Sequence, residues 1–139
     1  MDYLRVTREH FQELKRLHTL YKQEIGEDAP TDADFARLFE ALENGEILFY
    51  ACADAGKIIG VCSVCLTFST FNYQRGGVFE DFYILPAYRH RGIAKALVRF
   101  AREESGVGSL TVGCADCDAD MYKALGFTVP LGNMLAWDA

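Results

Sequence analysis

The stretch that most constrains this fold is a strand that ends at a proline and is followed at once by a basic, glycine-containing helix start. Residues 78–85 predict a β-strand, and Pro86 ends it because proline has no N–H for a sheet. A helix is predicted from Gly92 to Glu104. The free N–H groups at its start and its macrodipole form a ready site for phosphate, and the glycine lets a ligand approach closely. The sequence therefore predicts a phosphate cradle between a strand and a helix.

The charge distribution supports an anion site there. Between Pro86 and Arg102 lie five Lys/Arg residues and one histidine but no acid, so the segment carries +5 and the remainder −11 of the total −6. Arg99 and Arg102 have an alternative role, since cations complement a helix C-terminus. The segment is not a P-loop, because Gly-x-x-x-x-Gly-Lys is missing, and its single glycine does not make a dinucleotide fingerprint.

Length and composition indicate one domain over residues 1–139. Half of the 139 residues are hydrophobic and 24% are charged, which is enough for a packed core and unlike a disordered or low-complexity chain. No apolar run approaches the ~20 residues of a membrane span, and the N-terminus does not resemble a signal peptide. We therefore expect a cytoplasmic protein with no membrane partner. The negative net charge also argues against nucleic acid.

Hydrophobic periodicity and turn residues predict the order β-αα-βββ-α-β-α-ββ around one sheet. Apart from the strand and helix already described, the expected elements are a strand at 3–6, helices at 8–24 and 31–44, strands at 47–53 and 58–68, a strand at 110–114, a short helix at 121–125 and a final hairpin ending near Trp137. The strand at 58–68 is apolar on both faces, which predicts a central position.

The motif Arg89-x-x-Gly92-x-Ala94 resembles the acyl-CoA signature (Arg/Gln-x-x-Gly-x-Gly/Ala) of the GNAT acyltransferase superfamily. The order of elements is similar over essentially the whole chain, and Tyr122-x-x-Leu-Gly-Phe fits the same family. The run from Phe68 to Phe71 and the run from Glu80 to Arg89 are similar to the diamine (spermidine/spermine) and thialysine N-acetyltransferase branch. The resemblance implies an α/β (α+β) fold: a mixed, mostly antiparallel sheet of about six to seven strands, splayed to hold acyl-CoA, with about four helices.

The resemblance also implies acetyl-CoA as co-substrate, no metal, and, from family habit, a homodimer. Backbone amides of the loop would hold the pyrophosphate, main-chain groups of the strand would pair with the pantetheine arm, and Arg91 and Lys95 are candidates for the phosphates. Asp116 takes the place of a family asparagine in a connection that is one residue short. The implied cofactor residues are Phe82, Tyr83, Ile84, Arg89, His90, Arg91, Gly92, Ile93, Ala94, Lys95 and Asp116.

Two acidic residues and a tyrosine are the candidates for chemistry. An alkylammonium near pKa ~10.4 must lose a proton before it attacks, and Glu80 matches the residue that the diamine branch uses for this. Its neighbour Asp81 is expected on the opposite strand face, where it would bind substrate rather than form a catalytic pair. Tyr122 matches the family acid that protonates the thiolate. The alternatives are an edge charge or a dimer contact for the carboxylates, and core packing for the tyrosine.

The acceptor is expected to be a small cationic amine such as a polyamine, a lysine analogue or an aminoglycoside. The proposed acceptor wall comprises Glu24, Glu27, Asp28, Phe71 and Asp81. The acidic segment also includes Asp32 and Asp34, but acids belong in a helix N-terminal turn and aromatic residues in a core in any case, so these assignments stay open. Two other functions also stay open: a non-catalytic acyl-CoA-binding module, and an acetyltransferase for protein N-termini or lysines.

The cysteine spacing does not favour a metal. Cys62 and Cys65 lie three residues apart in a strand and so face opposite sides, and no knuckle glycine or proline separates them. Small buried hydrophobic roles account for them. The three histidines are scattered, and we assign none of them to catalysis.

Overall fold

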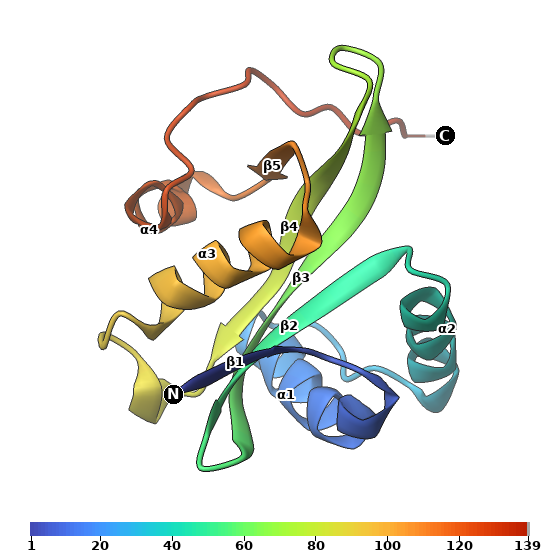
Figure 1. The fold of residues 1–139 in the computed structure, drawn as a ribbon, viewed down its shortest axis with the longest axis vertical. Coiled ribbons are helices and arrows are strands. Elements are labelled where there is room, and N and C mark those ends of the chain that lie inside the picture. The colour runs from blue at the N-terminus through green and yellow to red at the C-terminus, as the bar shows by residue number, and fades with distance from the viewer. Residues whose placement is uncertain (139) are drawn as a thin grey trace.

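A computed structural model describes residues 1–138, in which five strands form one sheet in the order β1-β2-β3-β4-β5 (Figure 1). β1 to β4 pair antiparallel, and β5 runs parallel to β4. The strands are β1 (Asp2–Arg5), β2 (Ile47–Asp54), β3 (Lys57–Ser69), β4 (Gln74–Ile84) and β5 (Ser109–Val112). The helices are α1 (Phe11–Glu24), α2 (Asp32–Glu43), α3 (Ile93–Ser105) and α4 (Ala119–Leu125).

The sheet is buried on both faces. Alternate residues of β2 and β3 point to a core under α3 and α4, while the residues between them point to a core under α1 and α2. Figure 1 shows the two helix pairs on opposite sides of the sheet. The first core contains Tyr50 and Leu97, and the second contains Phe49 and Leu17. β3 lies at the centre of the sheet, as predicted, and its cover on both faces explains its continuous apolar run.

Local sequence signals set most element boundaries. Thr31 caps α2: its hydroxyl accepts from the Asp34 N–H at 3.1 Å, and the Asp34 carboxylate accepts from the Thr31 N–H at 2.9 Å. β2 and β3 join through Ala55 and Gly56, both with positive φ, which is the predicted hairpin. The helix predicted from Gly92 is also confirmed, with Gly92 as its N-cap.

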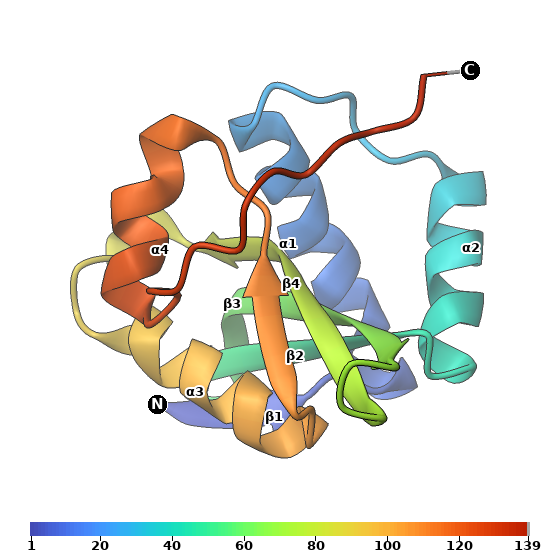
Figure 2. The ribbon, with the colours of Figure 1, turned by 90° about the horizontal axis from the view of Figure 1, so that it is seen from above.

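The prediction of six to seven strands was wrong, because the expected C-terminal hairpin is absent from the described residues. Within the described residues, 126–138 contain no strand (Figure 2). Pro130 cannot donate to a ladder, and Gly132 turns the chain with φ 94°, so no uninterrupted strand forms. The segment passes the end of β5, where Met134 lies against Gly113. No helix of the described chain is long and apolar enough to cross a membrane.

Candidate active site

The sheet splays open beside β4. β5 pairs with β4 only from Gly76 to Phe79 and then ends. β4 continues to Ile84 with β3 on one edge, and no described strand lies on the other. The free edge over residues 80–84 can pair with an extended ligand as another strand would. The side chains of Tyr83 and Ile84 are buried, so these two predicted cofactor residues offer only their main chain.

A loop rich in free N–H groups follows β4. A 3-10 turn, η2 (Pro86–Tyr88), leads through His90 with φ 62° and Gly92 with φ 76° into α3. The first N–H of the helix that bonds back is that of Ala96, to the Gly92 carbonyl at 3.3 Å. Six preceding N–H groups have no backbone partner in the described chain: those of His90, Arg91, Gly92, Ile93, Ala94 and Lys95. A Cβ built on Gly92 meets nothing within 4 Å, so the space above it is open, as a pyrophosphate requires.

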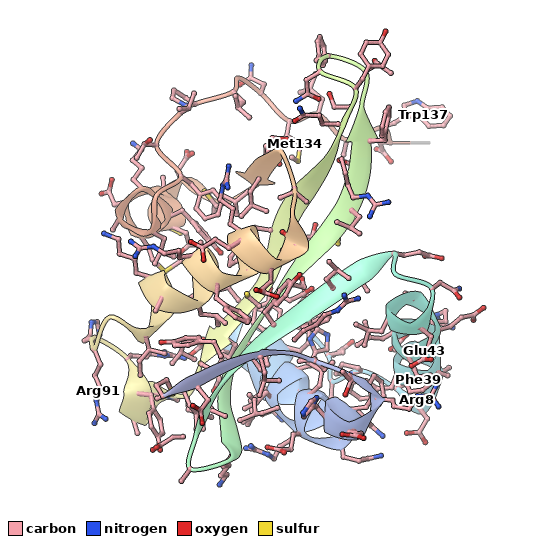
Figure 3. All side chains as sticks on the ribbon, viewed as in Figure 1. Arg8, Phe39, Glu43, Arg91, Met134 and Trp137 are labelled. Atoms are coloured by element: carbon pink, nitrogen blue, oxygen red, sulfur yellow. The ribbon has the colours of Figure 1, made fainter. Side chains whose placement is uncertain are left out.

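The cationic side chains of the loop and of the start of α3 differ in whether they are free to bind phosphate. Arg91 projects from the loop (Figure 3) and lies over the Tyr88 ring at 5.5 Å, while Lys95 lines a groove of about 300 Å³ between α3 and α4. Neither makes an ion pair within residues 1–138, so both are free for phosphate oxygens. Arg89 is different: its guanidinium bonds to Glu24 and to the Ile84 carbonyl.

A β-bulge brings the two adjacent carboxylates of β4 to one face. The β3–β4 register shifts between Val61 and Ser63, and Asp81 has φ 50°. The Ser63 hydroxyl donates to the Asp81 carboxylate at 2.7 Å, and the Cys65 thiol donates to the Glu80 carboxylate at 3.7 Å. Ser63 and Cys65 are two residues apart on β3 and therefore face the same side. The expectation that Glu80 and Asp81 face opposite sides was wrong, because the extra residue of the bulge breaks the alternation.

Helix α1 contributes two side chains that sequence reasoning missed. The His18 ring is buried between Tyr21, Phe35 and Phe49, and its Nδ1 has no described partner. Burial lowers the pKa of His18, and the nearby Asp81 charge opposes that shift. Burial raises the pKa of Tyr21 to about 12, and the Asp81 charge adds to this. The available signal was their spacing, since positions three apart on the apolar side of a helix share a face.

Tyr122 approaches from the opposite face of the sheet. Its half-buried ring in α4 packs edge-on against Phe79 at 6.4 Å, at the point where the β4–β5 pairing stops. Burial raises the pKa of Tyr122, and the nearby Asp118 and Cys114 raise it further, so the phenol is neutral at physiological pH. Asp116 is exposed at the start of η3 (Asp116–Asp118), the turn between β5 and α4.

Of the predicted acceptor residues, only Asp81 lies beside Glu80. Glu24 is engaged by Arg89, Glu27 pairs with Lys22 at 2.8 Å, and Asp28 is exposed between α1 and α2. Phe71 is fully exposed at the tip of the β3–β4 hairpin. That tip is roughly 20 Å along β4 from Glu80, given about 3.3 Å per strand residue.

The cysteines do not gather around a metal site in the described residues, where no group of three or more His, Cys, Asp or Glu side chains is close enough to hold an ion. Cys62 is buried in the core under α3, whereas Cys65 lies on the other face beside Glu80. This confirms that the two thiols point to opposite sides of β3.

The splayed sheet, the free strand edge and the N–H-lined loop together define an α+β acyltransferase fold. An acetyltransferase (GNAT) domain model matches residues 44–129, more than half of the chain. The chain belongs to the GNAT acetyltransferase family and is an acetyl-CoA-dependent N-acetyltransferase. No curated protein matches it significantly.

Solved structures share the fold at low sequence identity. A probable acetyltransferase has 20% identity and TM-score 0.82, with 100% of each chain covered. A predicted acetyltransferase from Clostridium acetobutylicum, solved with acetyl-CoA, has 18% identity and TM-score 0.79 over 99% of this chain and 95% of that one. An aminoglycoside acetyltransferase from an uncultured soil metagenomic sample, solved with sisomicin, has 14% identity and TM-score 0.84 over 99% and 95%.

Proposed function

We propose that this enzyme acetylates a primary amine of a small cationic acceptor. The observation that carries the proposal is the bulge at Asp81, which sets two carboxylates side by side next to the free edge of β4. Helix α1 packs on the same side of the sheet, and its His18 and Tyr21 are near enough to feel the Asp81 charge. Asp81 is half-buried and Glu80 is exposed, and two carboxylates side by side favour a cationic acceptor over a neutral one.

The donor, acetyl-CoA, fits the splayed edge and the loop. The free backbone over residues 80–84 would pair with the pantetheine arm, the loop N–H groups would hold the pyrophosphate, and Arg91 and Lys95 would meet phosphate oxygens. Asp116 lies in the connection after β5 and would face the middle of the donor. The thioester supplies an activated acetyl carbonyl, whose oxygen the Phe82 N–H would support.

Glu80 and Tyr122 divide the proton transfers. Only about one alkylamine in a few thousand is neutral at pH 7, so Glu80 removes a proton from the bound ammonium, directly or through water. The amine nitrogen then forms a bond to the acetyl carbon, and the carbon–sulfur bond breaks. Tyr122 gives its phenol proton to the thiolate and is reprotonated by the second nitrogen proton. One proton leaves through Glu80.

Asp81 holds the cationic acceptor while Ser63 fixes its carboxylate. The structural relative solved with sisomicin is called an aminoglycoside acetyltransferase, which supports a multiply charged amine here. Polyamines and lysine analogues belong to the same chemical class. The diamine or thialysine branch and the homodimer remain predictions.

The proposal is tested by following thiol release from acetyl-CoA with matched acceptors: a primary diamine, a monoamine of equal length, an aminoglycoside and the corresponding diol. We expect turnover with amines and none with the diol. Glu80→Gln should lower kcat about 100-fold, since positioned bases contribute at least that much. Glu103→Gln, an exposed carboxylate on α3, is the control. Full turnover by Glu80→Gln, or failure of every amine, would overturn the proposal.

A further inference from the structure

The Arg89 side chain of the signature motif is bound inside the protein. Its Nε donates to the Ile84 carbonyl at 2.8 Å, one of its terminal nitrogens donates to the Glu24 carboxylate at 2.7 Å, and the guanidinium lies over the Tyr83 ring at 5.4 Å. These contacts join the phosphate loop to the end of β4 and to the last residue of α1. The ion pair is partly shielded, with the two side chains 34% and 46% exposed.

The loop is strained and needs such restraints. His90 has a left-handed backbone without being glycine, a conformation that costs of order 1 kcal/mol or more and persists where surrounding contacts hold it. Arg89 restrains the loop on the α1 side. Tyr88 restrains it on the other side, where its hydroxyl donates to Asp54 at 2.8 Å in the β2–β3 hairpin. The N–H groups that have no backbone partner, those of residues 90–95, follow these two restraints directly in the chain.

We propose that Arg89, held by Glu24, is a positioning residue that fixes the loop for the donor's pyrophosphate, and that its side chain is not itself a phosphate ligand. The inference rests on the proposed donor site. It also assigns Glu24 to the cofactor site rather than to the acceptor wall. The end of α1 therefore helps to orient the loop N–H groups.

The two possible roles of Arg89 predict opposite effects of removing Glu24. If the guanidinium were a phosphate ligand, neutralising Glu24 would free it and remove a repelling charge, so acetyl-CoA would bind more tightly. If Arg89 acts by positioning, the same change releases the loop and acetyl-CoA binds more weakly. The sign of one change in Kd therefore separates the roles.

The experiment is calorimetric titration of the full chain with acetyl-CoA. Glu24→Gln should raise Kd about three- to fivefold, the range expected for an exposed-to-intermediate ion pair. Arg89→Ala should raise it about tenfold or more, because the bond to Ile84 is lost as well. The double variant should match Arg89→Ala alone, since both changes remove one restraint. Glu43→Gln, which breaks the ion pair with Arg8 at the end of α2, away from the loop, is the matched control and should change nothing.

Kinetics with a shortened donor separate loop positioning from general damage to the fold. S-acetylpantetheine has no pyrophosphate, so its KM should be the same for the wild type and Glu24→Gln, while the KM for acetyl-CoA rises and kcat stays constant. A general loss of structure would affect both donors. Tighter acetyl-CoA binding by Glu24→Gln, or equal effects of Glu24→Gln and Glu43→Gln, would overturn the inference.

Gly92→Glu distinguishes this inference from the donor site on which it rests. A side chain and a negative charge in the open space above the loop should abolish acetyl-CoA binding. If Gly92→Glu binds normally, the proposed donor site is wrong. If Gly92→Glu loses binding but Glu24→Gln does not, the donor site stands and the positioning role of Arg89 fails.

Discussion

The Ser63 hydroxyl donates a 2.7 Å hydrogen bond to the carboxylate of Asp81, whose backbone is left-handed at the bulge of β4. Ser63 is fully buried in the central strand, so the bond anchors a charged side chain from inside the sheet. It fixes the direction of Asp81 on the face that also carries Glu80. A buried serine thus helps to hold two carboxylates on one face of the sheet, although adjacent residues of a regular strand would point to opposite faces.

Ser63→Ala should therefore reduce both stability and acceptor affinity. Loss of a buried hydrogen bond to a charged group costs about 1–3 kcal/mol, and the freed carboxylate should raise KM for the amine without changing Kd for acetyl-CoA. Urea unfolding and steady-state kinetics measure the two effects. Ser105→Ala, at the end of α3, is the control because its bond is to an exposed helix carbonyl. An unchanged KM would show that Asp81 does not bind the acceptor.

The close pairing of β4 with its neighbours depends on Gly77. A Cβ there would lie 2.5 Å from Val64 Cγ1, whereas the nearest atoms to one on Gly76 would be the Thr67 and Ser109 hydroxyl oxygens, at 3.0 and 3.1 Å. Gly77→Ala should cost about 1–3 kcal/mol through overpacking, and Gly76→Ala less. Urea unfolding of the two variants compares neighbouring positions in one strand. Equal losses would mean that strand propensity, not packing, sets the requirement for glycine.

Local patterns were sufficient for much of the fold and for the loop. Three signals that act within a few residues delimit elements that the structure confirms: the proline after β4, the capping residues Thr31 and Asp34, and the glycine before α3. The predicted C-terminal hairpin is absent from the described residues, where Pro130 has no N–H to donate to a ladder. Apolar periodicity alone does not provide a partner edge with which to pair.

The missed features of the site all depend on pairing between distant segments. The bulge at Asp81 arises from the register between β3 and β4, which the sequence of β4 alone does not specify. Glu24 and Arg89 are 65 residues apart, so no local spacing indicates their ion pair. His18 looked like one of three scattered histidines until the packing of α1 on the sheet placed it near Asp81.

The five cysteines should fall into separate reactivity classes. Cys114 and Cys117 are exposed in the connection after β5. Burial raises the pKa of Cys52 to about 12, that of Cys65 to about 11 and that of Cys62 well above its usual value. Because the thiolate is the reactive form, a disulfide reagent at pH 8 should modify two thiols quickly and three slowly. More than two fast thiols would contradict the burial of the sheet cysteines.

Tyr122→Phe should lower kcat about 100-fold and leave the Kd for acetyl-CoA unchanged, because the neutral phenol acts only as the proton donor. Burial raises the pKa of Tyr122, so the donating form is present at neutral pH and is lost only at strongly alkaline pH, as the pH rises through that raised value. The wild type should therefore lose kcat on that alkaline limb, and Tyr122→Phe should lack the limb. Tyr50→Phe, in the same core, is the control. If Tyr122→Phe keeps the wild-type kcat and the alkaline limb, another group protonates the thiolate.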